Sequence, residues 1–444
     1  MSLAGGGSMQ RWARRTLSGT AVVGLAAGLL AIGTAAGSPP DVAPAPANAP
    51  AGRSAQGQTV EQLQRELDRV PGNWAAWSAL GLAYVEQARV TADPTLYTRA
   101  EGAFARSLQL RPEDNDAALT GQATLAAARH DFADALALTD RSLAVNDFSP
   151  TTWAVRSDAL TELGRYDEAR AAVQRLLDLS PDGVDGLTRA SYVLELRGDV
   201  DRARTALEQA AQEAERPADV AFAQQYLGEL AWNTGDLPAA RAAYEAGLAA
   251  DPSSLVLLAG RAKVTAAKGD AVAAAADYRR LVERLPAPEH LVAFGELLEA
   301  TGAPQDAEEQ YAVVRATQQL YAANGQDVDA ELALFEADHG DPATAVQLAA
   351  RAYAARPDSV HVQDAYAWAL HAAGRSAEAL PVARAAARLG LRSPSFAYHL
   401  GAVEAAAGDP AAARTALQRA LDLNPKFSPL HAPRAAALLD RLDG

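Results

Sequence analysis

A glycine recurs through most of this 444-residue chain at intervals of 33 to 38 residues, and an alanine follows it five positions later. The glycines are Gly164, Gly198, Gly235, Gly269, Gly302, Gly340, Gly374 and Gly408, with His130 in the same place one interval earlier. The alanines are Ala100, Ala135, Ala169, Ala203, Ala240, Ala274, Ala307, Ala345, Ala379 and Ala413. A fixed period of this length indicates a row of similar units, each packed mainly on its neighbours.

Each interval contains two short amphipathic runs, which are too short to be stable as isolated helices. The glycine ends the first run, because the turn that follows favours a residue in the left-handed conformation. In Gly408-Asp409-Pro410 the aspartate can cap the next helix and the proline can take its first position. The recurrent alanine is small enough for the two helices to pack closely. The sequence therefore predicts helix–turn–helix units.

The first unit carries the most specific pattern, which reads Trp77-x2-Leu80-Gly81-x2-Tyr84 and then Ala100-x3-Phe104 and Pro112, with seven extra residues between the two helices. This pattern resembles the tetratricopeptide repeat (TPR) family. The resemblance covers residues 73–425, or ten units, and implies an all-α fold, a right-handed superhelical solenoid. Residues 426–444 are expected to add a C-terminal capping helix over the last unit.

The N-terminal segment differs from the repeats. Three arginines between positions 11 and 15 precede a stretch without charged residues that lasts until Asp41. A basic flank, an apolar run and small residues are typical of a signal peptide, and the run is also long enough for a retained membrane anchor. We expect one or the other in residues 1–37, and a Pro/Ala-rich disordered linker in residues 38–60. Both alternatives predict an extracytoplasmic protein, either secreted or tethered to the membrane by this segment.

Motifs for chemistry are absent from the sequence. It contains no phosphate-binding loop, nucleophile turn or zinc-binding helix of the familiar spacings, and it has no cysteine. The seven histidines are dispersed, and Glu336-x-x-His339 lacks the second such pair that a di-metal bundle needs. The net charge of −15 argues against nucleic-acid binding. We therefore expect no enzyme, no catalytic residues, no cofactor and no metal.

The TPR resemblance implies a concave groove, lined by the first helix of each unit, in which a partner segment binds. The helical register assigns to this groove Asp158, Asp185, Tyr192, Glu195, Gln225, Glu229, Trp232, Lys263, Glu296, Trp368, His371 and Tyr398. An acidic groove with embedded aromatic residues would select a protein or peptide partner with a basic or arginine-containing segment. The alternative is that these charges are merely solvated and that aromatic residues such as Tyr192 and Trp232 belong to the core.

The sequence thus predicts a non-catalytic scaffold or adaptor of the cell envelope in a bacterium. The abundance of arginine over lysine and of alanine indicates a GC-rich genome. Two alternatives remain open: a self-assembling structural protein, and an accessory protein that binds the cell wall or its carbohydrate.

Overall fold

The structure is a computed structural model that describes residues 55–443. In this part of the chain there are 22 α-helices, one 3-10 turn and no strand. The helices are α1 (Ala55–Arg69), α2 (Trp74–Thr91), α3 (Leu96–Leu110), α4 (Asp116–Ala128), α5 (Phe132–Val145), α6 (Pro150–Glu162), α7 (Tyr166–Leu179), α8 (Val184–Glu195), α9 (Val200–Glu213), α10 (Pro217–Asn233), α11 (Leu237–Ala250), α12 (Leu255–Ala267), α13 (Ala271–Arg284), α14 (Pro288–Ala300), α15 (Pro304–Ala323), α16 (Asp329–His339), α17 (Pro342–Ala355), α18 (Val360–Ala372), α19 (Ser376–Ala386), α20 (Pro394–Ala406), α21 (Pro410–Leu423) and α22 (His431–Asp443), and the 3-10 turn is η1 (Ala387–Leu389).

Helices α2 to α21 form ten consecutive pairs, one for each predicted unit. Neighbouring pairs pack on one another, and at the junction of α15 with α16 the contact is made by side chains such as Tyr311 and Phe335. The predicted all-α solenoid is therefore confirmed. All ten recurrent alanines are at most 1% exposed, because each lies where the two helices of a pair are in contact. The core is correspondingly a series of small clusters between neighbouring helices, as expected for a repeat protein.

The turns inside the units are built as the sequence indicates, with one exception. Seven of the eight recurrent glycines have φ between 74° and 94°, and His130 takes the same left-handed conformation at φ 63°. Asp409 caps α21 by accepting a hydrogen bond from the Ala412 amide. Gly340, however, has φ −138°. In that turn the Glu336 carboxylate accepts a hydrogen bond from the Asp341 amide at 2.9 Å, so a side chain closes a turn that the left-handed glycine closes elsewhere.

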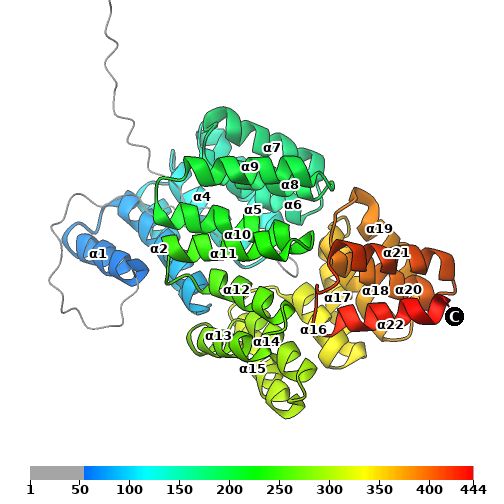
Figure 1. Ribbon diagram of the computed structural model, residues 1–444. Helices are drawn as coiled ribbons and strands as arrows, with labels where there is room; N and C mark the ends of the chain where they lie inside the picture. Colours follow the sequence, from blue (N-terminus) through cyan, green and yellow to red (C-terminus); the bar gives the residue numbers. More distant parts are fainter. Residues whose placement is uncertain (1–54, 444) are drawn as a thin grey trace, which may run out of the picture.

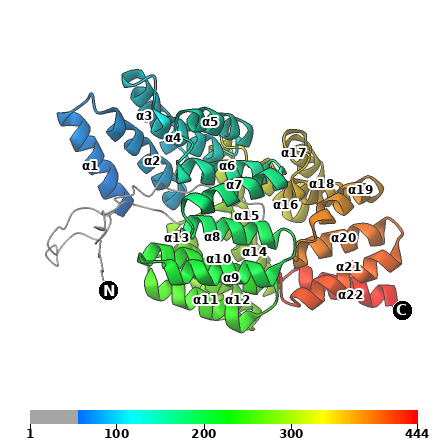
Figure 2. The same ribbon diagram turned by 90° about the horizontal axis from the view of Figure 1, so that it is seen from above.

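The array coils until its later units lie against its earlier ones. Figures 1 and 2 show α16–α22 returning beside the units that precede α12. We call this contact the seam, and its hydrogen bonds and ion pair are Arg129–Asp327, Glu162–Arg356, Tyr166–Val360, Tyr192–His361 and Trp232–Asn424. Because these partners are 169 to 198 residues apart in the sequence, the seam closes nearly one full superhelical turn.

Turn glycines of the earlier units pack directly against the seam. A β-carbon at Gly198 would lie 2.6 Å from the carbonyl oxygen of Gly390, and one at Gly235 would lie 2.3 Å from the carbonyl oxygen of Leu423. A β-carbon at Gly269 would meet no atom within 4 Å, although the backbone conformation is the same. Glycine is thus required at Gly198 and Gly235 for close approach as well as for the turn.

Two helices extend the array at its ends. The first, α1, begins at Ala55, inside the segment predicted as a disordered linker, because Val60, Leu63 and Leu67 lie on one face and pack against α2. The last, α22, contacts α20 and α21, in the position expected of a capping helix. The predicted signal peptide or anchor, residues 1–37, lies outside the described residues. No helix within residues 55–443 is long and apolar enough to cross a membrane.

Candidate functional site

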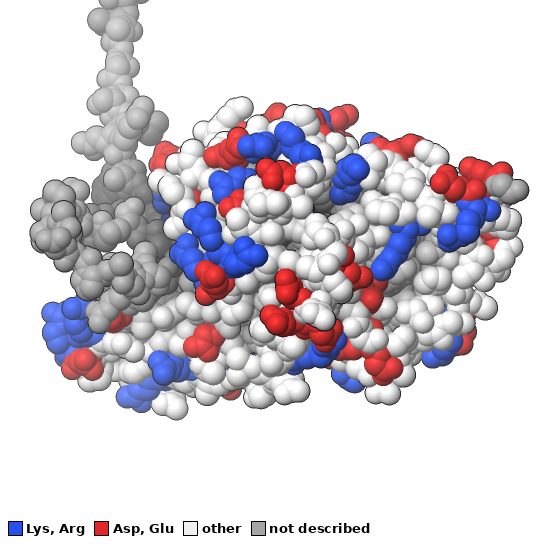
Figure 3. Space-filling model, turned by 60° about the horizontal axis from the view of Figure 1, so that its bottom comes forward, with Lys and Arg blue, Asp and Glu red and all other residues white. Residues whose placement is uncertain are grey.

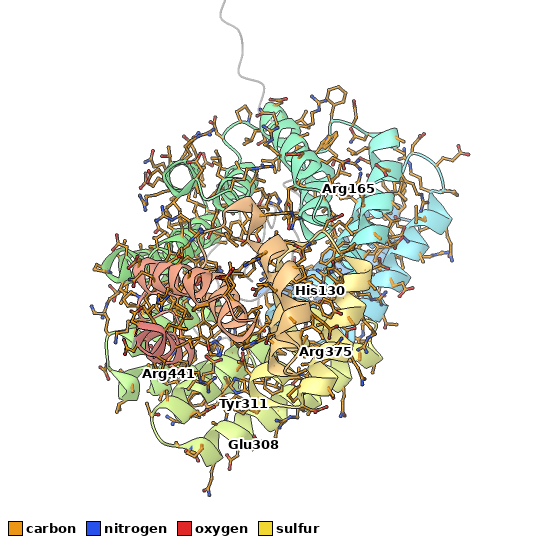
Figure 4. All side chains as sticks on the ribbon, turned by 90° about the vertical axis from the view of Figure 1, so that its right-hand side faces the viewer. His130, Arg165, Glu308, Tyr311, Arg375 and Arg441 are labelled. Carbon is orange, nitrogen blue, oxygen red and sulfur yellow. The ribbon has the colours of Figure 1, made fainter. Side chains whose placement is uncertain are left out.

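A central cavity of about 830 Å³, which we call the chamber, lies inside the coiled array. Its lining comes mainly from the first helices of the units, α2, α4, α8, α10, α12, α14, α16, α18 and α20, together with α22. Figure 4 looks at the array from the side of the last units, where the helices form a ring and His130 lies near its centre. The volume falls within the roughly 300–1,000 Å³ range of pockets for small molecules, so the chamber accommodates a short segment rather than a folded domain.

Seven of the twelve predicted groove residues line the chamber: Tyr192, Glu195, Gln225, Glu229, Trp232, Lys263 and Glu296. The other five do not line it: Asp158, Asp185, Trp368, His371 and Tyr398. The register therefore brings together the predicted residues of units four to seven except Asp185, whereas those of units three, nine and ten lie elsewhere. Whether the seven bind a partner stays a prediction.

The centre of the predicted recognition surface holds a cation from the protein itself. The Lys263 ammonium lies 2.7 Å from the Glu229 carboxylate and 4.8 Å from the centre of the Trp232 ring. Glu229 also accepts a hydrogen bond from the Tyr244 hydroxyl at 2.6 Å. Trp232 is only 7% exposed and belongs to a core cluster that includes Leu257. These side chains thus serve both the core and the chamber wall, and their polar groups are largely satisfied within the protein.

The predicted residues of unit three and early unit four form a buried ion pair between neighbouring helices. Arg189 on α8 binds Asp158 on α6 through two hydrogen bonds of 2.7 and 2.8 Å. Burial raises the pKa of Asp158 to about 7, although the Arg189 guanidinium acts in the opposite direction. Asp185 lies 3.9 Å from the same guanidinium. This set joins two units and does not face the chamber.

The predicted residues near the C-terminus form an aromatic cluster. Trp368 stacks on His399 with the ring centres 4.2 Å apart, and its indole Nε1 donates to Asp338 at 2.9 Å. Tyr398 packs against the same tryptophan in the core beneath α22. His371 bonds to Ser376 in its own unit. Because the last helix covers this face, Trp368 and Tyr398 are core rather than groove, whereas His371 is half-buried.

The histidines are dispersed in the sequence but converge in the structure, which was not predicted. Six of the seven line the chamber: His130, His290, His339, His361, His399 and His431. Burial lowers the pKa of His361 to about 4, so this ring is uncharged at neutral pH. Burial acts in the same direction on His399, but the Asp364 carboxylate at 2.9 Å outweighs it and raises the pKa. No sequence spacing could have grouped residues that come from six different units or ends of the array.

The charge of the chamber is predominantly acidic. Eight carboxylates line it, against three side chains of lysine or arginine. On the outside, Figure 3 shows basic and acidic side chains mixed in small groups over one face of the molecule, without one sign prevailing. Among residues 55–443 no three His, Asp or Glu side chains are arranged to hold a metal ion. The chamber therefore offers charge and aromatic surface for a ligand that carries positive charge.

This architecture defines a helical-repeat protein in which paired helices coil around a central cavity. The tetratricopeptide repeat family model matches residues 120–184, 188–254 and 365–427. These three segments, which together make up less than half of the chain, are similar to the tetratricopeptide repeat family, and the structure continues the same kind of helix pair between and before them.

The chain is similar to several solved structures at low sequence identity. A tetratricopeptide repeat protein from Parabacteroides merdae is 17% identical, with a TM-score of 0.40, covering 60% of this chain and 99% of that one. Cut9 in its hetero-tetramer with Hcn1 is 14% identical, also with a TM-score of 0.40, covering 87% and 94%. PilW, a type IV pilus biogenesis factor, is 20% identical with a TM-score of 0.39, covering 45% and 92%. No curated protein matches the chain by sequence.

Proposed function

We propose that this protein is a non-catalytic scaffold or adaptor of the bacterial cell envelope, which binds a short segment of a partner protein in the chamber. Tetratricopeptide repeat proteins generally mediate protein–protein interactions through the concave surface that their first helices form. The extracytoplasmic location rests on the composition of residues 1–37, which lie outside the described part of the chain.

The observation that carries the proposal is the convergence of first helices from nine of the ten units on one acidic, aromatic-lined chamber. A surface assembled from so many units is available only in the coiled array. Its surplus of carboxylates favours a partner segment that contains arginine or lysine, because opposite charge guides association and excludes acidic competitors.

The test is crosslinking in the native host followed by identification of the captured proteins. Wild type is compared with Ala259→Trp, which places a large side chain on a half-buried position of the chamber wall. The control is Ala246→Trp, at an exposed position on α11 outside the chamber. The proposal expects a defined extracytoplasmic partner that Ala259→Trp loses and the control retains.

Two results would overturn it. If both variants capture the same partner as wild type, the chamber is not the binding site. If wild type captures only further copies of itself, the protein is a self-assembling structural element instead.

A further inference from the structure

One carboxylate of the chamber stands apart from the others. Glu331, at the start of α16, has no ion-pair partner within the described residues, and its Oε2 atom is buried without a hydrogen bond. Most other carboxylates of the chamber have a partner: Glu86 has Arg89, Glu195 has Asn233, Glu229 has Lys263, Glu296 has His339 and Asp338 has Trp368. Glu289 has none either, but it is exposed.

Two further polar atoms that line the chamber, both on or just after α4, have no partner in this part of the chain; Nδ1 of His361 has none either, and Nε2 of His431 lies 3.2 Å from the Asp338 carboxylate. One is Oγ1 of Thr124, a residue only 1% exposed. The other is Nδ1 of His130, which follows the same helix, α4. Buried polar atoms are nearly always hydrogen-bonded in folded proteins. Unpartnered atoms of three side chains that line the same cavity therefore indicate a ligand that supplies the missing partners.

The free atoms of this group are chiefly acceptors. Burial lowers the pKa of His130, opposed by the Glu331 carboxylate and by a hydrogen bond to the backbone of Asp327, so the ring is uncharged at neutral pH. An uncharged imidazole that donates through one nitrogen accepts through the other, which here is Nδ1. The Glu331 carboxylate only accepts, and the Thr124 hydroxyl can do either. A ligand group that satisfies all three must be rich in N–H donors.

The two neighbouring arginines form their ion pairs with other carboxylates, although Nη2 of Arg356 and Nε of Arg129 are also buried without a hydrogen bond in this part of the chain. The Arg356 guanidinium, whose charge also reaches His130, binds Glu162 at 3.0 Å and does not line the chamber. Arg129 binds Glu101 at 3.1 Å. The group of acceptors exists only because the seam is closed, since the amide of Asp327 donates to the carbonyl of Arg129 at 2.9 Å and holds the start of α16 beside the end of α4.

We propose that Glu331, His130 and Thr124 form a subsite that binds the cationic end of an arginine or lysine side chain from the partner segment. This inference rests on the proposed function and specifies which part of the chamber recognises the basic residue. A guanidinium or ammonium group would form a charge-assisted hydrogen bond with Glu331 and ordinary hydrogen bonds with the other two side chains. Tyr97 and Tyr321, which line the same cavity, add aromatic surface for such a cation.

The experiment measures the affinity of capped alanine pentapeptides with one central arginine, lysine or citrulline by isothermal titration calorimetry. Citrulline has nearly the shape of arginine but no charge. For wild type we expect the arginine or the lysine peptide to bind about tenfold more tightly than the citrulline peptide, because a charge-assisted hydrogen bond to Glu331 is stronger than a neutral one. The comparison between arginine and lysine distinguishes guanidinium from ammonium.

Variants of single side chains test which residues cause this difference in affinity. Glu331→Gln should abolish the tighter binding of the charged peptides relative to the citrulline peptide. Thr124→Val changes the shape of the side chain little, and it should weaken binding of the basic peptide. Glu309→Gln removes the same charge from an exposed position on α15 that does not line the chamber, and it should leave the preference intact. Circular dichroism melting of each variant establishes that it is folded.

Three outcomes would overturn the subsite. They are a citrulline peptide that binds as tightly as the arginine or lysine peptide, an equal loss of affinity for the basic peptide in the two glutamate variants, or no binding of any peptide by wild type. Capture of a partner that Ala259→Trp abolishes but Glu331→Gln leaves unchanged would refute the subsite while leaving the proposed function intact.

Discussion

The Arg356 guanidinium lies 3.0 Å from the Glu162 carboxylate, although 194 residues separate the two in the sequence. Both side chains are almost fully buried, at 6% and 4% exposure. Nearby, the Tyr166 hydroxyl accepts a hydrogen bond from the Val360 amide at 2.8 Å. A charged pair in the interior between distant units fixes how far the solenoid coils, because only one relative position satisfies both partners.

Breaking this pair should be costly. Arg356→Met leaves a buried carboxylate without its cation, and we expect a loss of about 3–5 kcal/mol in the free energy of unfolding. The double variant with Glu162→Leu should lose less, because no unpaired charge remains. Urea denaturation, monitored by circular dichroism, measures the free energy of unfolding of wild type, of the two single variants and of the double variant. A double variant whose loss equals the sum of the single losses would show that the two side chains do not interact.

Two glycines with the same backbone conformation should differ in their tolerance of alanine. Gly269→Ala carries only the strain of a left-handed alanine, about 1–2 kcal/mol. Gly235→Ala carries the same strain and also places a methyl group against the carbonyl oxygen of Leu423, across the seam. We therefore expect Gly235→Ala alone to open the seam and to increase the radius of gyration measured by small-angle X-ray scattering. Identical radii for the two variants would contradict the role of the seam.

Glu195 should make stability depend on pH. Burial raises its pKa to about 7, the hydrogen bond from Asn233 opposes this shift, and the Glu229 carboxylate adds to it. Since the folded state binds this proton more tightly than the unfolded state, the stability that Glu195 contributes is complete below the ordinary carboxyl pKa, about 4.5, and is lost as the pH rises through about 7.

The variant Glu195→Gln stays neutral and can keep the bond to Asn233. It should match wild type near pH 4 and become more stable than wild type by up to about 3 kcal/mol near pH 8. Urea midpoints measured from about pH 4 to about pH 8 test the sign of this difference in stability. A wild type that is more stable at the higher pH would mean that the folded state favours the carboxylate.

Trp232 should behave as a core residue. Sequence reasoning expects Trp232→Ala to leave the fold nearly intact if the side chain faces the groove. The structure buries the ring among Ala221, Tyr244, Leu257 and Val264 while one side still meets the chamber. We therefore expect Trp232→Ala to cost about 3–5 kcal/mol in the free energy of unfolding. A loss below about 1 kcal/mol in thermal or urea denaturation would show that its contacts with the core contribute little.

The groove register was partly predictable from the sequence. Glu229, Trp232 and Lys263 follow the helical period of the first helices and reach the chamber together. Trp368 and Tyr398 follow the same period, yet α22 and its neighbours bury them. The period places a side chain on a helix face, but whether another helix covers that face depends on contacts beyond the unit.

The ten helix pairs, their turns and their close alanine contacts were determined by the sequence itself, because glycine, capping aspartate and apolar period act within a single unit of about 34 residues. The seam, the chamber and the subsite around Glu331 were decided only by the tertiary structure. Each unit is rotated slightly relative to the one before, and that rotation accumulates over nearly two hundred residues before Glu162 meets Arg356 and His130 meets Glu331. No local pattern encodes the sum of so many small rotations, so the residues that meet across the seam carry no mark of it in the sequence.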